Sequence, residues 1–470
     1  MVIRMKKIEN PYVQYMYSYP HKTAYRALSN ISIKEYLPKL IGGDNSLYFH
    51  IPFCQYKCGY CNLFSVAGQS EQWMESYVNA MEQQAVQLKS VMPEGVSFQD
   101  LTLGGGTPLI LPEDLLRKVF FIAREYLGFE KEGNSIIVET SPKQTTKEKL
   151  KLLKEEGVSR VSIGVQSFVE EELLKLNRFH KVNIARKALE SIREMDFACM
   201  NLDLIYGIPG QTMDSLQYSL EQALQYEPEE IFIYPLYVKP DTYLYQQGAK
   251  RAVNTYEMHK MVRQLLQDAG YTPHSMRRFV RNENRVKRIK TNKGHTLHSI
   301  GVGKKNEKVV HDTKQEAALQ LPESLCGFGN TISIGCGGRS YIGDLHFCTP
   351  YAVKQEKCLA VMKEYMERED YLQVSHGFVL SKEEQKRRYA IKHVLFGKGI
   401  NQKDYQGNFS TNVLEDFPVI KEWEQNGYVV IQNEYITLTE EGFGLSDYLG
   451  PQLISETVRR KCEAYYNDSL

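Results

Sequence analysis

The chain has 470 residues, of which 42% are hydrophobic and 24% charged, as in an ordinary soluble globular protein with material for several domains. A formal net charge of +1 excludes a molecule that attracts nucleic acid or acidic lipid through its overall charge. We expect neither a membrane span nor a secretory signal, because no apolar run approaches ~20 residues and the N-terminal stretch lacks an apolar core. Nine cysteines without a regular framework predict a reducing, cytoplasmic setting.

Six short apolar runs alternate with longer periodic segments. The predicted strands are residues 46–51, 100–105, 135–140, 160–165, 201–208 and 230–237, and the predicted helices include 72–88, 146–157 and 183–195. Nearly continuous apolar strands are typical of parallel sheets buried on both faces. The alternation predicts βαβ units in an open sheet or a barrel. Polar and glycine residues after most strands favour a barrel with its site at the carboxyl ends of the strands.

The pattern changes after residue 272. The stretch 277–290 carries seven Arg or Lys residues and one Glu, which indicates either a solvated connecting loop or a clamp for an anion or nucleic acid. Residues 332–343 form an apolar run followed by a glycine-rich turn. From residue 380 the pattern is helical, and 427–442 is predicted to form a hairpin. Helices with a small hairpin indicate a winged-helix-like domain.

Cys54, Cys58 and Cys61 follow the first predicted strand with the spacing C-x3-C-x2-C. Thiolates bind zinc or iron–sulfur clusters. A structural zinc site needs four ligands, and His50 is the one candidate for the fourth. Three thiolates leave one iron of a 4Fe–4S cluster open, which predicts a bound cofactor or substrate there. Apolar packing does not explain three thiols in a polar loop.

The stretch "HIPFCQYKCGYC" resembles the radical S-adenosylmethionine (SAM) superfamily, and within it the family of oxygen-independent coproporphyrinogen III oxidase. The resemblance continues in order through "GGGTP", "VETSP", "SIGVQSF", "LNRFH" and "LDLIYGIPGQT". It implies an α/β fold: a partial (β/α)6 TIM-like barrel of the radical SAM type with a C-terminal helical, winged-helix-like domain. The implied domains are a substrate-covering segment (1–45), the barrel core (46–240), an extension and linker with the basic loop (241–375), and the helical domain (376–470).

The resemblance also implies the site. Cys54, Cys58 and Cys61 would hold a 4Fe–4S cluster, whose open iron binds SAM and whose electron yields a 5′-deoxyadenosyl radical. The implied SAM contacts are Tyr48, Tyr60, Gly104, Gly105, Gly106, Thr107, Glu139, Gln166, Arg178 and Asp203, with Tyr48 and Glu139 nearest the chemistry. Within this set, Arg178 faces the SAM carboxylate, and Gln166 and Asp203 face its ribose.

The family holds several chemistries on this scaffold. Residues 336–353 and 445–454 look more like methyltransferase-type relatives, which predicts methyl or methylene transfer from a second SAM to an sp2 carbon. The alternatives are oxidative decarboxylation of coproporphyrinogen III and, outside enzymes, a haem carrier, for which His346 near Cys348 is the only hint. Cys326, Cys336 and Cys348 are expected to be inert buried thiols. We expect a monomer that takes a small-molecule substrate and electrons from flavodoxin or ferredoxin, without membrane or nucleic acid.

Overall fold

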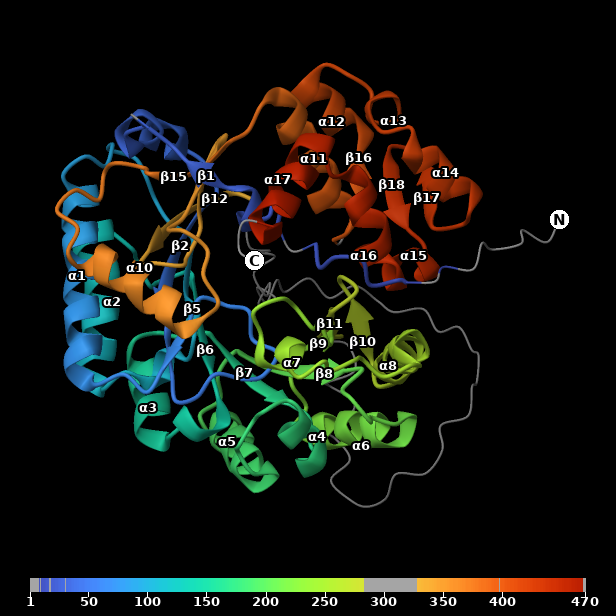
Figure 1. Cartoon of the computed structure of the whole chain (residues 1–470), viewed down its shortest axis with the longest axis horizontal. Coiled ribbons are helices and arrows are strands. Elements are labelled where there is room, and N and C mark those ends of the chain that lie inside the picture. The colour runs from blue at the N-terminus through green and yellow to red at the C-terminus, as the bar shows by residue number, and fades with distance from the viewer. Residues whose placement is uncertain are drawn as a thin grey trace, which may run out of the picture.

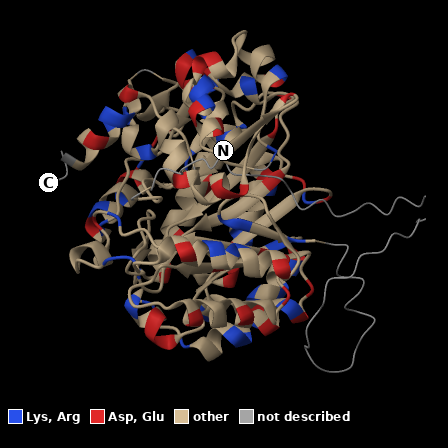
Figure 2. Ribbon diagram, turned by 90° about the vertical axis from the view of Figure 1, so that its right-hand side faces the viewer, with Lys and Arg blue, Asp and Glu red and all other residues tan. Residues whose placement is uncertain are grey.

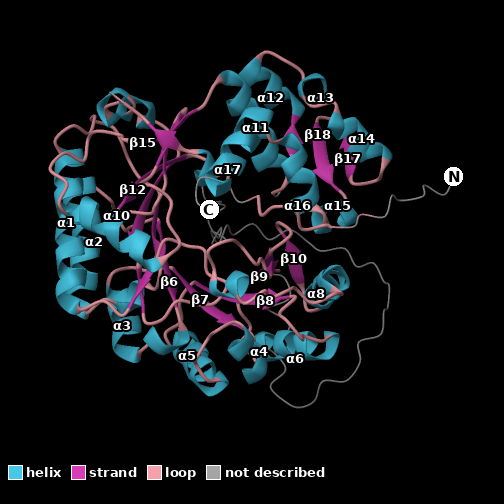
Figure 3. Cartoon of the chain, viewed as in Figure 1, coloured by secondary structure: helices cyan, strands magenta, loops and turns pink. Residues whose placement is uncertain are grey.

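The computed structural model describes residues 8, 10–16, 18–29, 31–282, 328–396 and 398–467. Seven parallel strands stand side by side at its centre, inside a curved wall of helices (Figure 3). In sheet order they are β12 (Asn330–Ile334), β2 (Asn45–Ile51), β5 (Asp100–Gly105), β6 (Ser135–Thr140), β7 (Arg160–Gln166), β8 (Cys199–Tyr206) and β9 (Glu230–Pro235). The six predicted strands are confirmed, and they neighbour one another in chain order as in a partial (β/α)6 barrel. The seventh, β12, was not predicted as part of the barrel.

Helices connect the strands and cover the outside of the sheet. They are α1 (Glu71–Lys89), α2 (Glu113–Leu127), α3 (Lys147–Glu155), α4 (Glu170–Lys175), α5 (Val182–Glu194), α6 (Met213–Leu224) and α8 (Thr255–Asp268). Polar caps begin several of them: the Ser70 and Thr146 side chains accept hydrogen bonds from the first turns of α1 and α3. Gly157, predicted to end α3, has a φ of +84°, which a side chain would strain.

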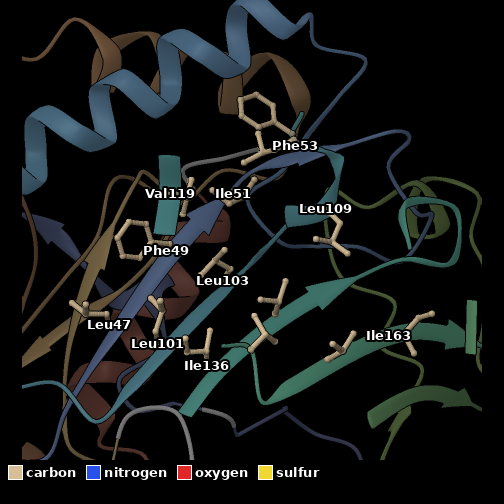
Figure 4. Packing of buried hydrophobic residues seen from close by; sticks show 14 of the residues in the cluster. Leu47, Phe49, Ile51, Phe53, Leu101, Leu103, Leu109, Val119, Ile136 and Ile163 are labelled. Carbon is tan, nitrogen blue, oxygen red and sulfur yellow. The ribbon is translucent and has the colours of Figure 1, made fainter. Parts of the chain in front are cut away.

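The two faces of β2 have different surroundings. Leu47, Phe49 and Ile51 are fully buried and point toward the helices (Figure 4). Because side chains alternate along a strand, Tyr48 and His50 point to the opposite face, into the barrel. The outer face therefore anchors the strand in the core, while the inner face is free to line a site.

Antiparallel strands extend both sides of the barrel. On the β12 side lie β13 (Ser340–Ile342), β14 (Leu345–Phe347), β15 (His376–Val379) and β1 (Arg26–Ala27), backed by α10 (Gln355–Met366). On the β9 side lie β11 (Arg278–Arg281) and β10 (Tyr271–Pro273). Short 3-10 helices are η1 (Lys22–Ala24), η2 (Ile33–Glu35), η3 (Leu37–Leu40), η4 (Pro108–Ile110), η5 (Pro142–Gln144) and η6 (Gly450–Leu453).

The β10–β11 hairpin corrects the prediction of the basic stretch for Arg278 and Arg281, which lie in a strand and belong neither to a solvated loop nor to an anion clamp. Arg278 of β11 pairs with Glu230, and Arg281 pairs with Glu229 at 2.8 Å. These arginines already have acidic partners inside the protein, so they hold the hairpin on β9. Residues 283–290, the rest of the stretch, lie outside the described residues.

The C-terminal region is helical with a small sheet, as predicted. Its helices are α11 (Lys382–Val394), α12 (Gln402–Phe409), α13 (Val413–Asp416), α14 (Val419–Gln425), α15 (Glu440–Gly444), α16 (Ser446–Leu449) and α17 (Glu456–Asn467), and its sheet has the order β16 (Ile400–Asn401), β18 (Tyr435–Leu438), β17 (Val429–Gln432). The predicted hairpin is β17–β18. Charges of both signs are intermixed over the ribbon (Figure 2). Within the described ranges, no helix combines the length and apolar character of a bilayer span.

Candidate active site

The three cysteines lie in one loop at the carboxyl end of β2. Cys54 ends β3 (Phe53–Cys54), which pairs with β4 (Val66–Ala67) and so closes the loop between them. The backbone N–H of Cys61 donates to the carbonyl of Cys58 at 3.1 Å. All three thiols are free and partly exposed. The loop therefore presents three potential thiolate ligands from a backbone that is fixed at both ends.

The zinc alternative finds no support in this loop. Both ring nitrogens of His50 have partners: Nε2 lies 2.9 Å from the Phe64 carbonyl and Nδ1 lies 3.3 Å from the Tyr48 hydroxyl. Burial lowers the pKa of His50 to about 4, so the ring is neutral. In the part of the chain that the structure describes, no three His, Cys, Asp or Glu side chains converge as ligands of a single ion. Three thiols in one loop instead suit a 4Fe–4S cluster with one open iron.

The glycine loop after β5 lies directly against the cysteine loop. The N–H of Gly106 donates to the Ile51 carbonyl and that of Thr107 to the Phe53 carbonyl, both at 2.8 Å. A Cβ on Gly106 would lie 2.5 Å from the Phe53 carbonyl oxygen, so only glycine allows this approach. The Thr107 hydroxyl lies 3.8 Å from the Sγ of Cys54. The "GGGTP" sequence thus forms a cradle around the first cysteine.

Two carboxylates face the interior from β6 and β8. The Gly105 N–H donates to Glu139 at 3.1 Å, and a Cβ on Gly104 would lie 2.9 Å from the same carboxylate. Asp203 accepts from the Asn201 side chain at 2.8 Å. Burial raises the pKa of Glu139, and burial together with the charge of Glu139 raises the pKa of Asp203 to about 7. The structure therefore brings the two predicted carboxylates into electrostatic contact.

Gln166 and Arg178 shape the end of β7. Gln166 follows an irregularity in the β7–β8 register and has a φ of +75°, a strained conformation for a side-chain-bearing residue. Arg178 donates to the Gly164 carbonyl at 2.6 Å, to the Sγ of Cys58 at 3.2 Å and to the Tyr60 hydroxyl at 3.3 Å. Arg178 thus ties β7 to the cysteine loop; its predicted contact with the SAM carboxylate stays a prediction, as do the other SAM contacts.

The comparisons with known proteins agree with this geometry. A family model described as the radical SAM superfamily matches residues 48–223. The chain is 27% identical to heme chaperone HemW of Bacillus subtilis (strain 168), over 84% of this chain and 96% of that protein. It is 25% identical to oxygen-independent coproporphyrinogen III oxidase of Escherichia coli (strain K12), over 84% of this chain and 82% of that protein. Residues 48–223 therefore form a radical SAM domain. The cofactors of this domain are a 4Fe–4S cluster and SAM.

A solved structure supports the fold of this radical SAM protein over nearly its whole length. Coproporphyrinogen III oxidase (HemN) from Escherichia coli superposes with a TM-score of 0.75 and 21% identity, covering 93% of this chain and 96% of that one. At this identity the likeness concerns the fold. None of these similarities supports the methyl transfer expected from residues 336–353 and 445–454, which stays a prediction.

An N-terminal strap (residues 10–16 and 18–25) runs between the radical SAM barrel and the C-terminal helices (Figure 1). The ring of Tyr15 stacks on Tyr237, with centroids 5.9 Å apart, and lies 4.0 Å from the guanidinium of Arg277. Arg277 in turn forms a buried ion pair with Asp447 of α16. Tyr19 donates to Glu384 of α11. The strap is therefore fixed on both sides, to the barrel and to the C-terminal domain.

Positive side chains from separate segments gather beside the strap. We call Lys22, Lys239, Arg251, Arg277 and Arg339 the basic rim. Lys22 is 7% exposed and lies 3.9 Å from the ring centroid of Tyr351. Burial and then the charge of Arg339 lower its pKa to about 7. Burial, followed by the charges of Arg251 and Arg277, lowers the pKa of Lys239.

Sequence reasoning did not find the basic rim. Its members come from the strap, the segment between β9 and α8, the residue before β11 and the β12–β13 turn. The strap carried one signal, because the resemblance implied that residues 1–45 cover the substrate. Arg277 begins the basic stretch 277–290, for which an anion clamp was one expectation, whereas Lys239, Arg251 and Arg339 have no distinguishing sequence pattern.

Two of the three remaining cysteines, Cys336 and Cys348, are buried. Cys336 is fully enclosed, and its N–H donates to the Tyr77 hydroxyl at 2.9 Å. Burial raises the pKa of Cys348 to about 11, which keeps this thiol protonated at neutral pH. Cys326 lies outside the described residues. His346, the hint of a haem ligand, has no exposed surface and packs against the Tyr341 ring at 4.5 Å.

The affinity for SAM is expected to fall as the pH drops through about 7. If Asp203 holds the ribose, its carboxylate accepts from the hydroxyls above this pKa, whereas the acid formed below it loses charge and acceptors. Besides burial, the groups that act on the pKa of Asp203 are Asn201, through a hydrogen bond, and Glu139, Arg160 and Glu230, through their charges. Anaerobic calorimetry of SAM binding from about pH 6 to about pH 8.5 should show up to ~10-fold weaker binding per unit below pH 7. Asp203→Asn should bind weakly with a flat profile; an unchanged slope would assign the titration to another group.

Proposed function

We propose that this protein cleaves SAM reductively and uses the radical to oxidise a carboxylate-bearing substrate in the cytoplasm. The chemistry is that named for its coproporphyrinogen III oxidase relatives: one hydrogen atom leaves a propionate-like side chain, carbon dioxide departs, and one electron passes to an external acceptor. The observation that carries the proposal is the basic rim. Lys22 lies near Arg339, and Lys239 lies near Arg251 and Arg277; burial and then these charges lower the pKa values of both lysines, and cations gathered in this way favour an anionic substrate.

Of the acidic side chains near the rim, one neutralises Arg277 and one is paired with a lysine outside the rim. Asp447 pairs with Arg277, and Asp241 pairs with Lys354 at 3.3 Å. Lys22, Lys239 and Arg251 lie next to aromatic faces, respectively Tyr351, Tyr237 and Tyr12. A flat substrate with carboxylate arms matches both features, since tyrosine rings contact its apolar body while cations contact the carboxylates.

The chain's own residues have separate roles around the cofactors. When bound at Cys54, Cys58 and Cys61, the cluster and SAM supply a carbon-centred radical that abstracts hydrogen. The glycine loop and Glu139 hold the chain close beside the cysteine loop. Arg178 donates to a cluster ligand and fixes its orientation. The strap covers the barrel interior and limits the entry of water.

Anaerobic assays with the reconstituted cluster test the proposal. We expect 5′-deoxyadenosine to form with SAM and a chemical reductant, and its formation to rise when coproporphyrinogen III or a related polycarboxylate is added. Release of carbon dioxide would mark oxidative decarboxylation. S-adenosylhomocysteine as a product would instead support methyl transfer, and tight haem binding without SAM cleavage would support haem carriage; either result would contradict the proposal.

The basic rim gives a matched pair of variants. Lys22→Met is expected to raise the KM for the carboxylate substrate by ~10-fold or more, because one charge-assisted hydrogen bond is lost. SAM cleavage without substrate should stay unchanged. Lys89→Met, at an exposed lysine of α1, is the control and should leave both quantities unchanged. An unaltered KM in Lys22→Met would contradict the role of the rim.

A further inference from the structure

Lys57, a residue of the cysteine loop, donates all its hydrogen bonds to backbone. Its Nζ donates to the carbonyls of Leu63 at 3.3 Å, Ser65 at 2.9 Å and Val353 at 2.6 Å. An ammonium group has three N–H donors, so all of them are used. Leu63 and Ser65 follow the last cysteine of the loop, and Val353 belongs to the segment between β14 and α10. Lys57 therefore joins the loop to the chain that follows it and to the segment before α10.

The loop is also fixed by contacts that do not involve Lys57. The N–H of Gly59 donates to the carbonyl of Leu176 at the end of α4, and the N–H of Leu244 in α7 (Tyr243–Gln246) donates to the Gly59 carbonyl, both at 2.9 Å. The pairing of β3 with β4 closes the loop at its base. Because these contacts are made by backbone, we expect the loop to keep its course when the Lys57 side chain is exchanged.

The positive charge of Lys57 has no acidic partner among the described residues. Its three acceptors are uncharged carbonyls, and no Asp or Glu of the described ranges pairs with it. The charge reaches two of the three loop thiols: burial raises the pKa values of Cys54 and Cys61, and the charge of Lys57 works against this rise in both. Lys57 thus places an unpaired positive charge next to the thiols.

Arg178 and Lys22 are also cations near the loop, but each has a further contact that Lys57 lacks. Arg178 donates to the Sγ of Cys58 at 3.2 Å, so it contacts a potential cluster ligand directly. Lys22 belongs to the basic rim, and burial followed by the charge of Arg339 lowers its pKa to about 7, so it is only partly charged at neutral pH. The described contacts of Lys57 include no Sγ atom. Its influence on a bound cluster is therefore electrostatic, and substitution can isolate it.

We propose that Lys57 raises the reduction potential of the 4Fe–4S cluster and so promotes the reduction that precedes SAM cleavage. Reduction adds one electron to a cluster that three thiolates make negative, and a fixed positive charge stabilises the reduced state more than the oxidised state. The reductant loses one electron for each cluster reduced, while Lys57 keeps its proton and exchanges no atoms. Lys57 can act in this way only if Cys54, Cys58 and Cys61 hold the cluster; the substrate named in the proposed function plays no part.

A redox titration of the reconstituted full-length protein with dithionite tests this role. The reduced cluster is quantified by electron paramagnetic resonance without SAM or substrate, so the reading does not depend on turnover. Lys57→Gln keeps amide N–H donors and loses the charge. At a fixed potential, its ratio of reduced to oxidised cluster should fall about tenfold, which equals a shift of about 59 mV to more negative potential for a one-electron couple.

Two variants control for changes other than charge. Lys57→Arg keeps both the charge and the N–H donors and should titrate as the unaltered protein does. Lys154→Gln is the matched control, because Lys154 of α3 also donates to a backbone carbonyl, that of Asp196 at 3.0 Å. This contact precedes β7 and β8, at the end of the barrel opposite to the cysteine loop, so Lys154→Gln should leave the potential unchanged.

The outcomes are distinct. Equal potentials in Lys57→Gln and the unaltered protein overturn the proposal, and so does an equal shift in Lys57→Gln and Lys57→Arg, which would show an effect of shape and not of charge. If Lys57→Gln loses the cluster or the fold, Lys57→Met is titrated in its place. Loss in both neutral variants assigns Lys57 to cluster assembly and also overturns the proposal. Failure of a polycarboxylate to raise 5′-deoxyadenosine formation is a separate result, which contradicts the proposed function alone.

Discussion

Replacing Cys54, Cys58 or Cys61 with Ala is expected to abolish SAM cleavage and leave the barrel folded. Each variant removes one of the three thiolates that we assign to the cluster, so the rate should fall by at least ~10^3-fold, which corresponds to about 4 kcal/mol of barrier. The loop itself should persist, because β3 pairs with β4 and Gly59 bonds to α4 and α7 through the backbone. Three measurements separate these effects. Iron and sulfide content reports cluster binding, 5′-deoxyadenosine formation reports SAM cleavage, and the thermal unfolding midpoint reports folding.

Cys462→Ala is a suitable control for the cysteine variants. Cys462 lies on α17, is partly buried and is a free thiol like the three cluster cysteines. Its variant should keep cluster content and rate. Full activity in any one of the three loop variants would contradict the assignment of the cluster ligands, whereas loss of folding in all three would show that the thiols stabilise the chain itself.

Glu230→Ala is expected to give the largest loss of stability among single substitutions in the barrel. Glu230 has no exposed surface and lies between two guanidinium groups: Arg278 of β11 donates from Nε at 2.9 Å, and Arg160 of β7 lies 2.7 Å away. Without the carboxylate, two buried cations face each other, which costs about 3–5 kcal/mol. Urea unfolding followed by circular dichroism should show a clearly lower midpoint.

Because of the position of Glu230, Glu230→Ala should not change the activity of the folded protein. Glu230 and Arg160 begin their strands, so they lie at the end of the barrel opposite to the cysteine loop. Activity per folded molecule is therefore expected to stay near that of the unaltered protein at low temperature. The control is Glu155→Ala, which removes an exposed partner of Arg117 and should leave the midpoint nearly unchanged. Equal midpoints in the two variants would contradict a stabilising role for the buried triad.

Features with local causes were predictable from the sequence. Each central strand is a continuous apolar run, and its length follows from the turn residues at its ends, as with Gly157 before β7. The cysteine loop was predictable because three thiols within eight polar-loop residues are typical of a metal or cluster site. The sequence placed Glu139 at the end of a predicted strand, and the resemblance implied that Asp203, within another predicted strand, contacts the ribose; the two strands belong to one parallel sheet.

Features that depend on distant partners were not predictable. The run at 330–334 has the same apolar character as the other strands, yet nothing local says that it pairs with β2. The basic stretch looked solvated because the acids that neutralise it, Glu229, Glu230 and Asp447, lie elsewhere in the sequence. His50 looked like a possible ligand because its partner, the Phe64 carbonyl, is a backbone atom that no side-chain pattern reveals.

The pairing of β12 with β2 also determines where the chain can be cut for expression. The superfamily match ends at residue 223, before β9 and far before β12. A fragment cut to that match would leave β2, the strand that leads into the cysteine loop, with a bare backbone edge ready to pair with another molecule. It would also lack Glu230, the acid that Arg160 needs. The segment that defines the superfamily on a sequence map is therefore not an independent folding unit, and expression of this protein should retain residues 10–467.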